Sequence, residues 1–140
     1  MLMLSAGQRD LIRDKGTILG RALIGLLFFA SGLTMAFTGG ASYLAGAVAF
    51  LGPLAIIAAW IAVLLKIVAG AAIIIGVRVG LASASLVVFI LIATIIAHMN
   101  WSDPMQITAT LKNLAIIGGL LYLMAYGPGG ANTTRLSNGN

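Results

Sequence analysis

The chain has no cysteine and no glutamate, and its one histidine is His98. The absence of cysteine excludes disulfides, iron–sulfur clusters and thiolate zinc sites. A single histidine cannot form a bis-histidine haem site, and Asp10, Asp14 and Asp103, the chain's acidic residues, lie outside its long apolar runs. Paired-carboxylate catalysis and carboxylate-bridged metal centres are therefore excluded. We predict no catalytic residues, no metal ligands and no covalently held cofactor.

Charge is also scarce, since charged residues make up 8% of the chain and hydrophobic residues 61%. A soluble domain carries about 25% charged residues, because its surface faces water. This chain has too few charges for such a surface, so we predict an integral membrane protein whose main partner is the lipid bilayer. The net charge is +5, and half of the basic residues lie near the N-terminus: Arg9, Arg13, Lys15 and Arg21. Such a distribution is typical of orientation signals beside membrane spans, not of nucleic-acid binding.

The long apolar runs predict an all-α membrane protein with four transmembrane helices in one bundle. Each run approaches the ~20 residues that cross the hydrocarbon core of a bilayer. A proline at position 53 suits the first turn of the second helix, where its missing N–H costs nothing. The expected spans are 17–37, 53–77, 79–97 and 111–126, within a single membrane domain over residues 1–140.

The segments around the spans are more polar or richer in small residues. Residues 1–16 carry Ser5 and Gln8 at capping-box spacing, so a short interfacial helix is expected there. Residues 38–53 are rich in glycine and alanine, and we expect an interfacial or re-entrant helix between the first two spans. Residues 127–140 open with GPGG and have no apolar periodicity, which is typical of a tail outside the membrane.

The basic residues predict the orientation of the bundle. With four spans, both termini and the turn between the second and third spans share one side of the membrane. That side collects Arg9, Arg13, Lys15, Arg21, Arg78 and Arg135. The loops on the opposite side have no basic residue, and only Lys112 lies nearby, at the start of the fourth span. The positive-inside rule therefore predicts a cell membrane protein, inner or plasma, with both termini in the cytoplasm.

Lys66 is the one charged residue in the middle of an apolar run. It lies 13 residues after Pro53 and 12 before Arg78, so at ~1.5 Å per residue it is ~18–20 Å from either border. Ionisable residues at this depth are functional candidates by default. Small residues share its helical face, which predicts that the face contacts protein. These residues are Ala55, Ala58, Ala59, Ala62, Ala69 and Gly70.

No carboxylate lies at a depth that matches Lys66, whereas the hydroxyls of Ser31 and Tyr122 do. We therefore predict a Lys66–Tyr122–Ser31 cluster inside the bundle. In one interpretation, a neutral lysine hydrogen-bonds two helices together. In the others, the cluster binds the carbonyl or anionic headgroup of a lipid-like ligand, or relays a proton.

A second polar group is expected at the outer interface: His98, Asn100, Trp101, Lys112 and Asn113. In a structural interpretation, Trp101 anchors an aromatic belt and Lys112 extends toward the headgroups. In a functional one, the group lines the mouth of a pocket and holds a quinone headgroup or a partner's polar surface. On the other side, Arg21 is expected to snorkel to the interface, and Arg78 to bind lipid phosphate or cap helix carbonyls.

Five stretches, in order, resemble the DoxX family of small four-span membrane proteins. They are GLLFFASGLTMAF (25–37), YLA (43–45), AVLLKIVAGAAIIIGVRVG (62–80), ATIIAHMNW (93–101) and LKNLAIIGGLLYLMAYGPG (111–129). Together they cover the chain from about residue 20 to 129. Many DoxX proteins carry a glutamate where this chain has Lys66, so the resemblance transfers no role to that position.

The resemblance implies association with membrane oxidoreductase systems. The first expectation is a non-catalytic subunit that anchors or stabilises a redox or electron-transport complex, with other membrane or membrane-associated subunits as partners. The alternative is a quinone-interacting subunit of the thiosulfate:quinone type, in which Lys66 and Tyr122, or His98 and Lys112, contact the headgroup. A small-solute transporter is a weaker alternative. A dissociable quinone or lipid is the expected ligand.

Overall fold

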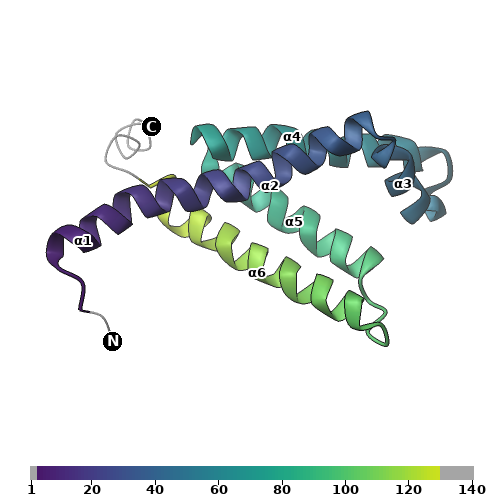
Figure 1. Cartoon of the computed structure of the whole chain (residues 1–140). Helices are drawn as coiled ribbons and strands as arrows, with labels where there is room; N and C mark the ends of the chain where they lie inside the picture. The colour runs from purple at the N-terminus through teal and green to yellow at the C-terminus, as the bar shows by residue number, and fades with distance from the viewer. Residues whose placement is uncertain (1–2, 130–140) are drawn as a thin grey trace.

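The computed structural model describes residues 3–129, and every regular element within that range is a helix (Figure 1). The elements are α1 (Ala6–Leu11), η1 (Ile12–Gly16), α2 (Thr17–Phe37), α3 (Gly40–Ala47), η2 (Ala49–Leu54), α4 (Ala55–Ile75), α5 (Val79–Ala97) and α6 (Pro104–Tyr126). Four stretches are long and apolar enough to span a membrane: Ala6–Phe37, Ala49–Ile75, Val79–Ala97 and Pro104–Tyr126. The predicted all-α fold with four spans is confirmed.

Two of the helices, α1 and α6, have a side-chain cap at the N-terminus. The Ser5 hydroxyl accepts a hydrogen bond from the Gln8 backbone N–H, and the Gln8 side chain accepts one from the Ser5 N–H, which completes a capping box for α1. Asp103 accepts from a backbone N–H in the first turn of α6, and Pro104 occupies the first helical position. The helix therefore begins at Pro104, before the predicted start of the fourth span at Leu111.

The connections between spans depend on residues with positive φ. Gly76 ends α4 at φ 90°, and Arg78 at φ 47° precedes α5, the only non-glycine with positive φ in residues 3–129. This left-handed pair reverses the chain in very few residues. Gly39 at φ 76° separates α2 from α3, and Gly52 at φ 58° kinks η2. The short helix expected between the first two spans is therefore α3, followed by η2.

The closest helix contact joins α2 to α4. A Cβ atom on Gly25 would lie 2.8 Å from the carbonyl oxygen of Gly70, and one on Gly70 would lie 2.6 Å from the backbone nitrogen of Phe29. Only glycine allows the two backbones to come this close, and lipid-embedded helices associate through such contacts. The face of α4 that meets α2 is the predicted small-residue face. It buries Ala55, Ala59, Val63, Lys66, Ala69 and Gly70.

The other extensive contact joins α5 to α6, and the two helix pairs meet through a shared core. Ile73 of α4, Leu86 of α5 and Leu120 of α6 are fully buried there. By contrast, α2 and α6 have few contacts. Figure 1 shows that α6 lies near α2 only at the C-terminal end of α6, and that the two helices diverge from there. Large apolar side chains on the outer faces of all four spans are exposed, as expected of helices that contact lipid.

Arg21 links three segments at one end of the bundle. Its side chain is 6% exposed, and Nη1 donates to the Pro128 carbonyl at 2.9 Å and Nη2 to the Ile74 carbonyl at 3.5 Å. A Cβ atom on Gly76 would lie 2.5 Å from Nη1, so this glycine also makes room for the guanidinium. The side chain of Arg21 therefore does not extend outward as expected, because carbonyls near the ends of α4 and α6 offer acceptors inside the protein. Its place at the membrane interface stays a prediction.

Replacement of Gly25 by alanine should destabilise the bundle by ~1–3 kcal/mol, because the added methyl group would overlap the backbone of α4. The matched control is Gly20→Ala on the same helix, where an added Cβ meets no atom within 4 Å. That control should be neutral or slightly stabilising, since alanine favours a helix. Thermal unfolding of both variants in detergent micelles measures the difference, and equal stabilities would contradict the assigned crossing.

Replacement of Arg21 by lysine should lower the free energy of unfolding by ~1.5–3 kcal/mol, because a single ammonium cannot reproduce the guanidinium fork that reaches two carbonyls. The control is Arg78→Lys, since Arg78 is exposed. The measurement is a denaturant titration in micelles. If both lysine variants unfold at the same midpoint, the Arg21 hydrogen bonds do not stabilise the fold.

Candidate functional site

All four spans contribute to one cavity of about 480 Å³, a volume within the usual ~300–1,000 Å³ of small-molecule sites. Most of its wall is apolar, with side chains such as Phe28 of α2 and Ile90 of α5. Its polar residues are Ser31 of α2, Lys66 of α4, and Lys112 and Asn113 of α6. No carboxylate is among the described residues that line it. The cavity is therefore an apolar space with two amines on its wall.

Lys66 is the most deeply placed of these polar residues. It lies near the middle of α4 and is 8% exposed. Its Nζ donates to the Ser31 hydroxyl oxygen at 2.5 Å and to the Met35 sulfur at 3.3 Å, and it lies 6.0 Å from the centre of the Phe89 ring. An ammonium group has three N–H donors, and a thioether is a weak acceptor. Ser31 is thus the one strong acceptor that these contacts supply.

The position of Lys66 follows from the α2–α4 crossing. Gly32 of α2 would bring a Cβ atom within 3.1 Å of the Lys66 Cβ, so the two helices are close at this level. Ser31 precedes that glycine, and Met35 lies four residues after Ser31, on the same side of α2. The close approach therefore directs the lysine toward both side chains. The predicted pairing of Lys66 with Ser31 is present in the structure.

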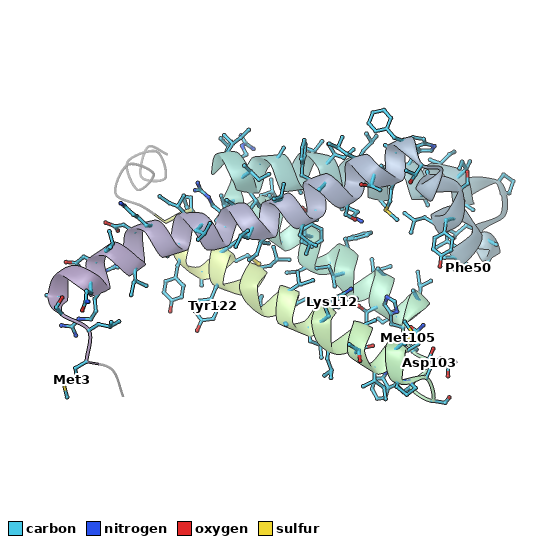
Figure 2. The ribbon with its side chains drawn as sticks, in the orientation of Figure 1. Met3, Phe50, Asp103, Met105, Lys112 and Tyr122 are labelled. Carbon is cyan, nitrogen blue, oxygen red and sulfur yellow. The ribbon has the colours of Figure 1, made fainter. Side chains whose placement is uncertain are left out.

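Tyr122 does not join this pair, contrary to the predicted three-residue cluster. It is 71% exposed, stacks on Tyr126 with ring centres 5.7 Å apart, and lines a different cavity near Arg21. Figure 2 shows it pointing outward from α6. The buried face of α6 carries Leu120 and Leu123. Because successive helical residues are turned by about 100°, Tyr122 lies nearly opposite Leu120, at a suitable depth but on the wrong face.

Lys112 shares the Lys66 cavity, although the sequence placed it with His98 at the outer interface. It lies about two turns inside α6, on the part of the helix toward Asp103 (Figure 2). The neighbouring Asn113 donates through Nδ2 to the Thr94 hydroxyl at 2.9 Å, which holds α6 against α5. Lys112 itself is exposed, so its chain lies at the edge of the cavity.

His98 belongs to a separate hydrogen-bond network at the α5–α6 connection. Its Nδ1 lies 2.6 Å from the Gln106 Oε1, and its carbonyl accepts from the Trp101 indole N–H at 3.2 Å and from the Thr110 hydroxyl at 3.1 Å. These bonds join the end of α5 to the start of α6. Trp101 remains exposed, and so does Arg78 at the opposite end of the molecule. Their roles toward lipid stay predictions.

Two residues of the Lys66 environment were missed at the sequence level, Met35 and Phe89. Both are apolar types that carry no polar signal in an apolar run. The spacing of four residues between Ser31 and Met35 was the available clue, because it places both on one helical face. Within residues 3–129, no three His, Cys, Asp or Glu side chains come together in a way that could hold a metal ion.

Comparison with known proteins corrects the family assignment. The sequence model of the SURF4 family matches residues 37–135. Neither curated protein sequences nor solved structures give a match. The DoxX assignment is therefore wrong, and so are the redox-complex, electron-transport and quinone functions predicted with it.

The error has a physical source. The stretches that resembled DoxX are largely apolar runs with paired small residues, which any tightly packed membrane helix needs. The lysine at position 66, where DoxX proteins often carry a glutamate, was evidence against the DoxX assignment. The membrane nature of the chain stands. The match covers well over half of the sequence, and the chain belongs to the SURF4 family.

Proposed function

We propose that the protein binds an acidic amphiphile of the bilayer in the cavity between its four spans, with Lys66 holding the acid group. The observation that carries this proposal is the position of Lys66. It is a buried lysine in the middle of α4, on the wall of an apolar cavity, with a hydroxyl and a thioether as its hydrogen-bond partners.

For a charged lysine, the energetics favour a ligand. A cation at this depth in a membrane costs several kcal/mol, and a neutral hydroxyl partner offsets little of it. An anion in the cavity would provide the missing charge through charge-assisted hydrogen bonds, which are roughly twice as strong as neutral ones. Phe28, Ile90 and their neighbours would contact the hydrocarbon of the same molecule through van der Waals packing.

We also propose that both termini face the cytoplasm of a cell membrane. The Arg21–Pro128 hydrogen bond supports a common side, because it joins the beginning of α2 to the segment that follows α6. Arg13 and Lys15 precede α2 at that end, and Arg78 lies in the turn between α4 and α5. The positive-inside rule assigns the basic end to the cytoplasm.

We also propose that other membrane proteins pack against this chain. Gly25, Gly32 and Gly70 make their close contacts within the chain. An added Cβ on Gly20 or Gly118 would meet no atom within 4 Å, so these positions leave helix surface open to another helix.

Lys66→Met should reduce the acidic lipid that co-purifies with the protein by at least about tenfold, since one charge-assisted bond is worth ~1.5–3 kcal/mol. Extraction of bound lipids after detergent purification, followed by mass spectrometry, measures the loss. Lys15→Met removes an exposed lysine outside the cavity and is the control.

A second variant separates binding from folding. Ser31→Ala removes the hydroxyl partner of Lys66 but keeps the amine, so it should lose less of the bound lipid than Lys66→Met does. If Lys66→Met folds and carries as much acidic lipid as the unmodified protein, Lys66 does not bind the ligand.

The orientation can be tested by labelling, because the chain has no cysteine of its own. Ser102→Cys in the α5–α6 connection should react with a membrane-impermeant maleimide on intact cells. Lys15→Cys in η1 should react only after the membrane is permeabilised. The reverse pattern would place both termini outside.

A further inference from the structure

We infer that the acid group bound in the cavity is a phosphate monoester of a membrane lipid, held jointly by Lys66 and Lys112. The inference rests on the proposed function and names the headgroup that the same site would select.

Charge is the first reason. Two lysines line the cavity, Lys66 inside it and Lys112 at its edge, and no carboxylate among the described lining residues balances either of them. The acidic residues lie outside this cavity: Asp103 caps α6, and Asp10 and Asp14 line the cavity near Arg21. A phosphate monoester carries about −1.5 to −2 at neutral pH, whereas a fatty-acid carboxylate or a phosphodiester carries one charge. Of these three acid groups, the monoester alone carries enough charge for both lysines, and an uncompensated cation is costly in a membrane.

Hydrogen bonding is the second reason. A phosphate monoester offers three terminal oxygens as strong acceptors. Lys66 of α4 and Lys112 of α6 approach the cavity from different spans and could each meet one of them. Ser31 accepts from Lys66, which leaves its own O–H free to donate to a further oxygen. A carboxylate has two oxygens, so one of them would have to accept from two of these three donors.

Depth decides between a lipid and free phosphate. Lys112 lies eight residues after Pro104, which places it ~12 Å along α6, and Lys66 lies eleven residues after Ala55, ~16 Å along α4. The backbone of both residues thus lies inside the ends of the helices, and the cavity between them is also lined by apolar side chains such as Leu27 and Ile116. Lys66 is buried there, whereas Lys112 lies exposed at the edge of the cavity. Inorganic phosphate would have to leave water without any apolar part to contact these side chains, whereas the hydrocarbon of a lipid is already at this depth in the bilayer.

The test uses the full chain, purified and stripped of lipid in micelles. Native mass spectrometry or calorimetry would compare four probes: phosphatidic acid, phosphatidylglycerol with the same acyl chains, oleic acid and inorganic phosphate. Phosphatidic acid should bind about tenfold more tightly than the two singly charged lipids, since it makes one more charge-assisted contact, and inorganic phosphate should not compete. Lys112→Gln should remove this preference while leaving weaker lipid binding, and Lys15→Gln should change neither.

The outcomes distinguish failure of the phosphate monoester assignment from failure of the proposed function. If phosphatidylglycerol or oleic acid binds as tightly as phosphatidic acid, and Lys66→Met abolishes that binding, the monoester assignment is wrong and the proposed function stands. Preference for phosphatidic acid that survives Lys112→Gln overturns the joint role of the lysines. Inorganic phosphate that competes as well as the lipid overturns the lipid assignment. If no probe binds to folded protein, both the inference and the proposed function are wrong.

Discussion

The contact of α2 and α4 through Gly25 and Gly70 is the constraint on which the two buried basic side chains depend. Because the two backbones nearly touch there, the residues on either side of the crossing are held close as well. One turn before Gly25, Arg21 reaches the carbonyl of Ile74. Toward the other end of α2, Ser31 receives the hydrogen bond from Lys66. A single small-residue contact therefore positions both buried basic side chains.

The two helix pairs are held together by different interactions. Between α2 and α4, the contact is close packing of backbone at glycines, as expected where lipid supplies no hydrophobic drive. Between α5 and α6, side-chain hydrogen bonds contribute, including Asn113 to Thr94 and Thr110 to the His98 carbonyl. The pairs then share the core around Leu86 and Leu120. The cavity lies where the four spans face one another without filling the space.

The general architecture could be predicted because it depends on length and hydropathy alone. The number of spans follows from the apolar runs, and the small-residue face of α4 indicated correctly that Lys66 contacts protein. Ser31 was found from its depth. Depth was estimated by counting residues from the ends of each span. The estimate failed for Tyr122, since depth gives the position of a side chain along a helix but not the face on which it lies.

The hydrogen bonds of Arg21 could not be predicted from the sequence for a different reason. Its place near a predicted helix end suggested an interfacial role, but its acceptors are carbonyls of residues far away in the sequence. No local pattern reveals that α4 ends beside it. The family assignment failed for a related reason, because apolar helices that pack closely use the same few small residues in unrelated proteins.

The depth of Lys66 along α4 has a consequence for membrane asymmetry. Lipid headgroups normally stay at the bilayer surface, since moving a charged group into the hydrocarbon is strongly unfavourable. A lipid whose phosphate met Lys66 would have its headgroup well below its neighbours in the same leaflet. Lys66 would then compensate the charge of the phosphate at a depth that is a large part of the way to the opposite leaflet. A cavity of this kind would lower the barrier to exchange of that lipid between the two leaflets.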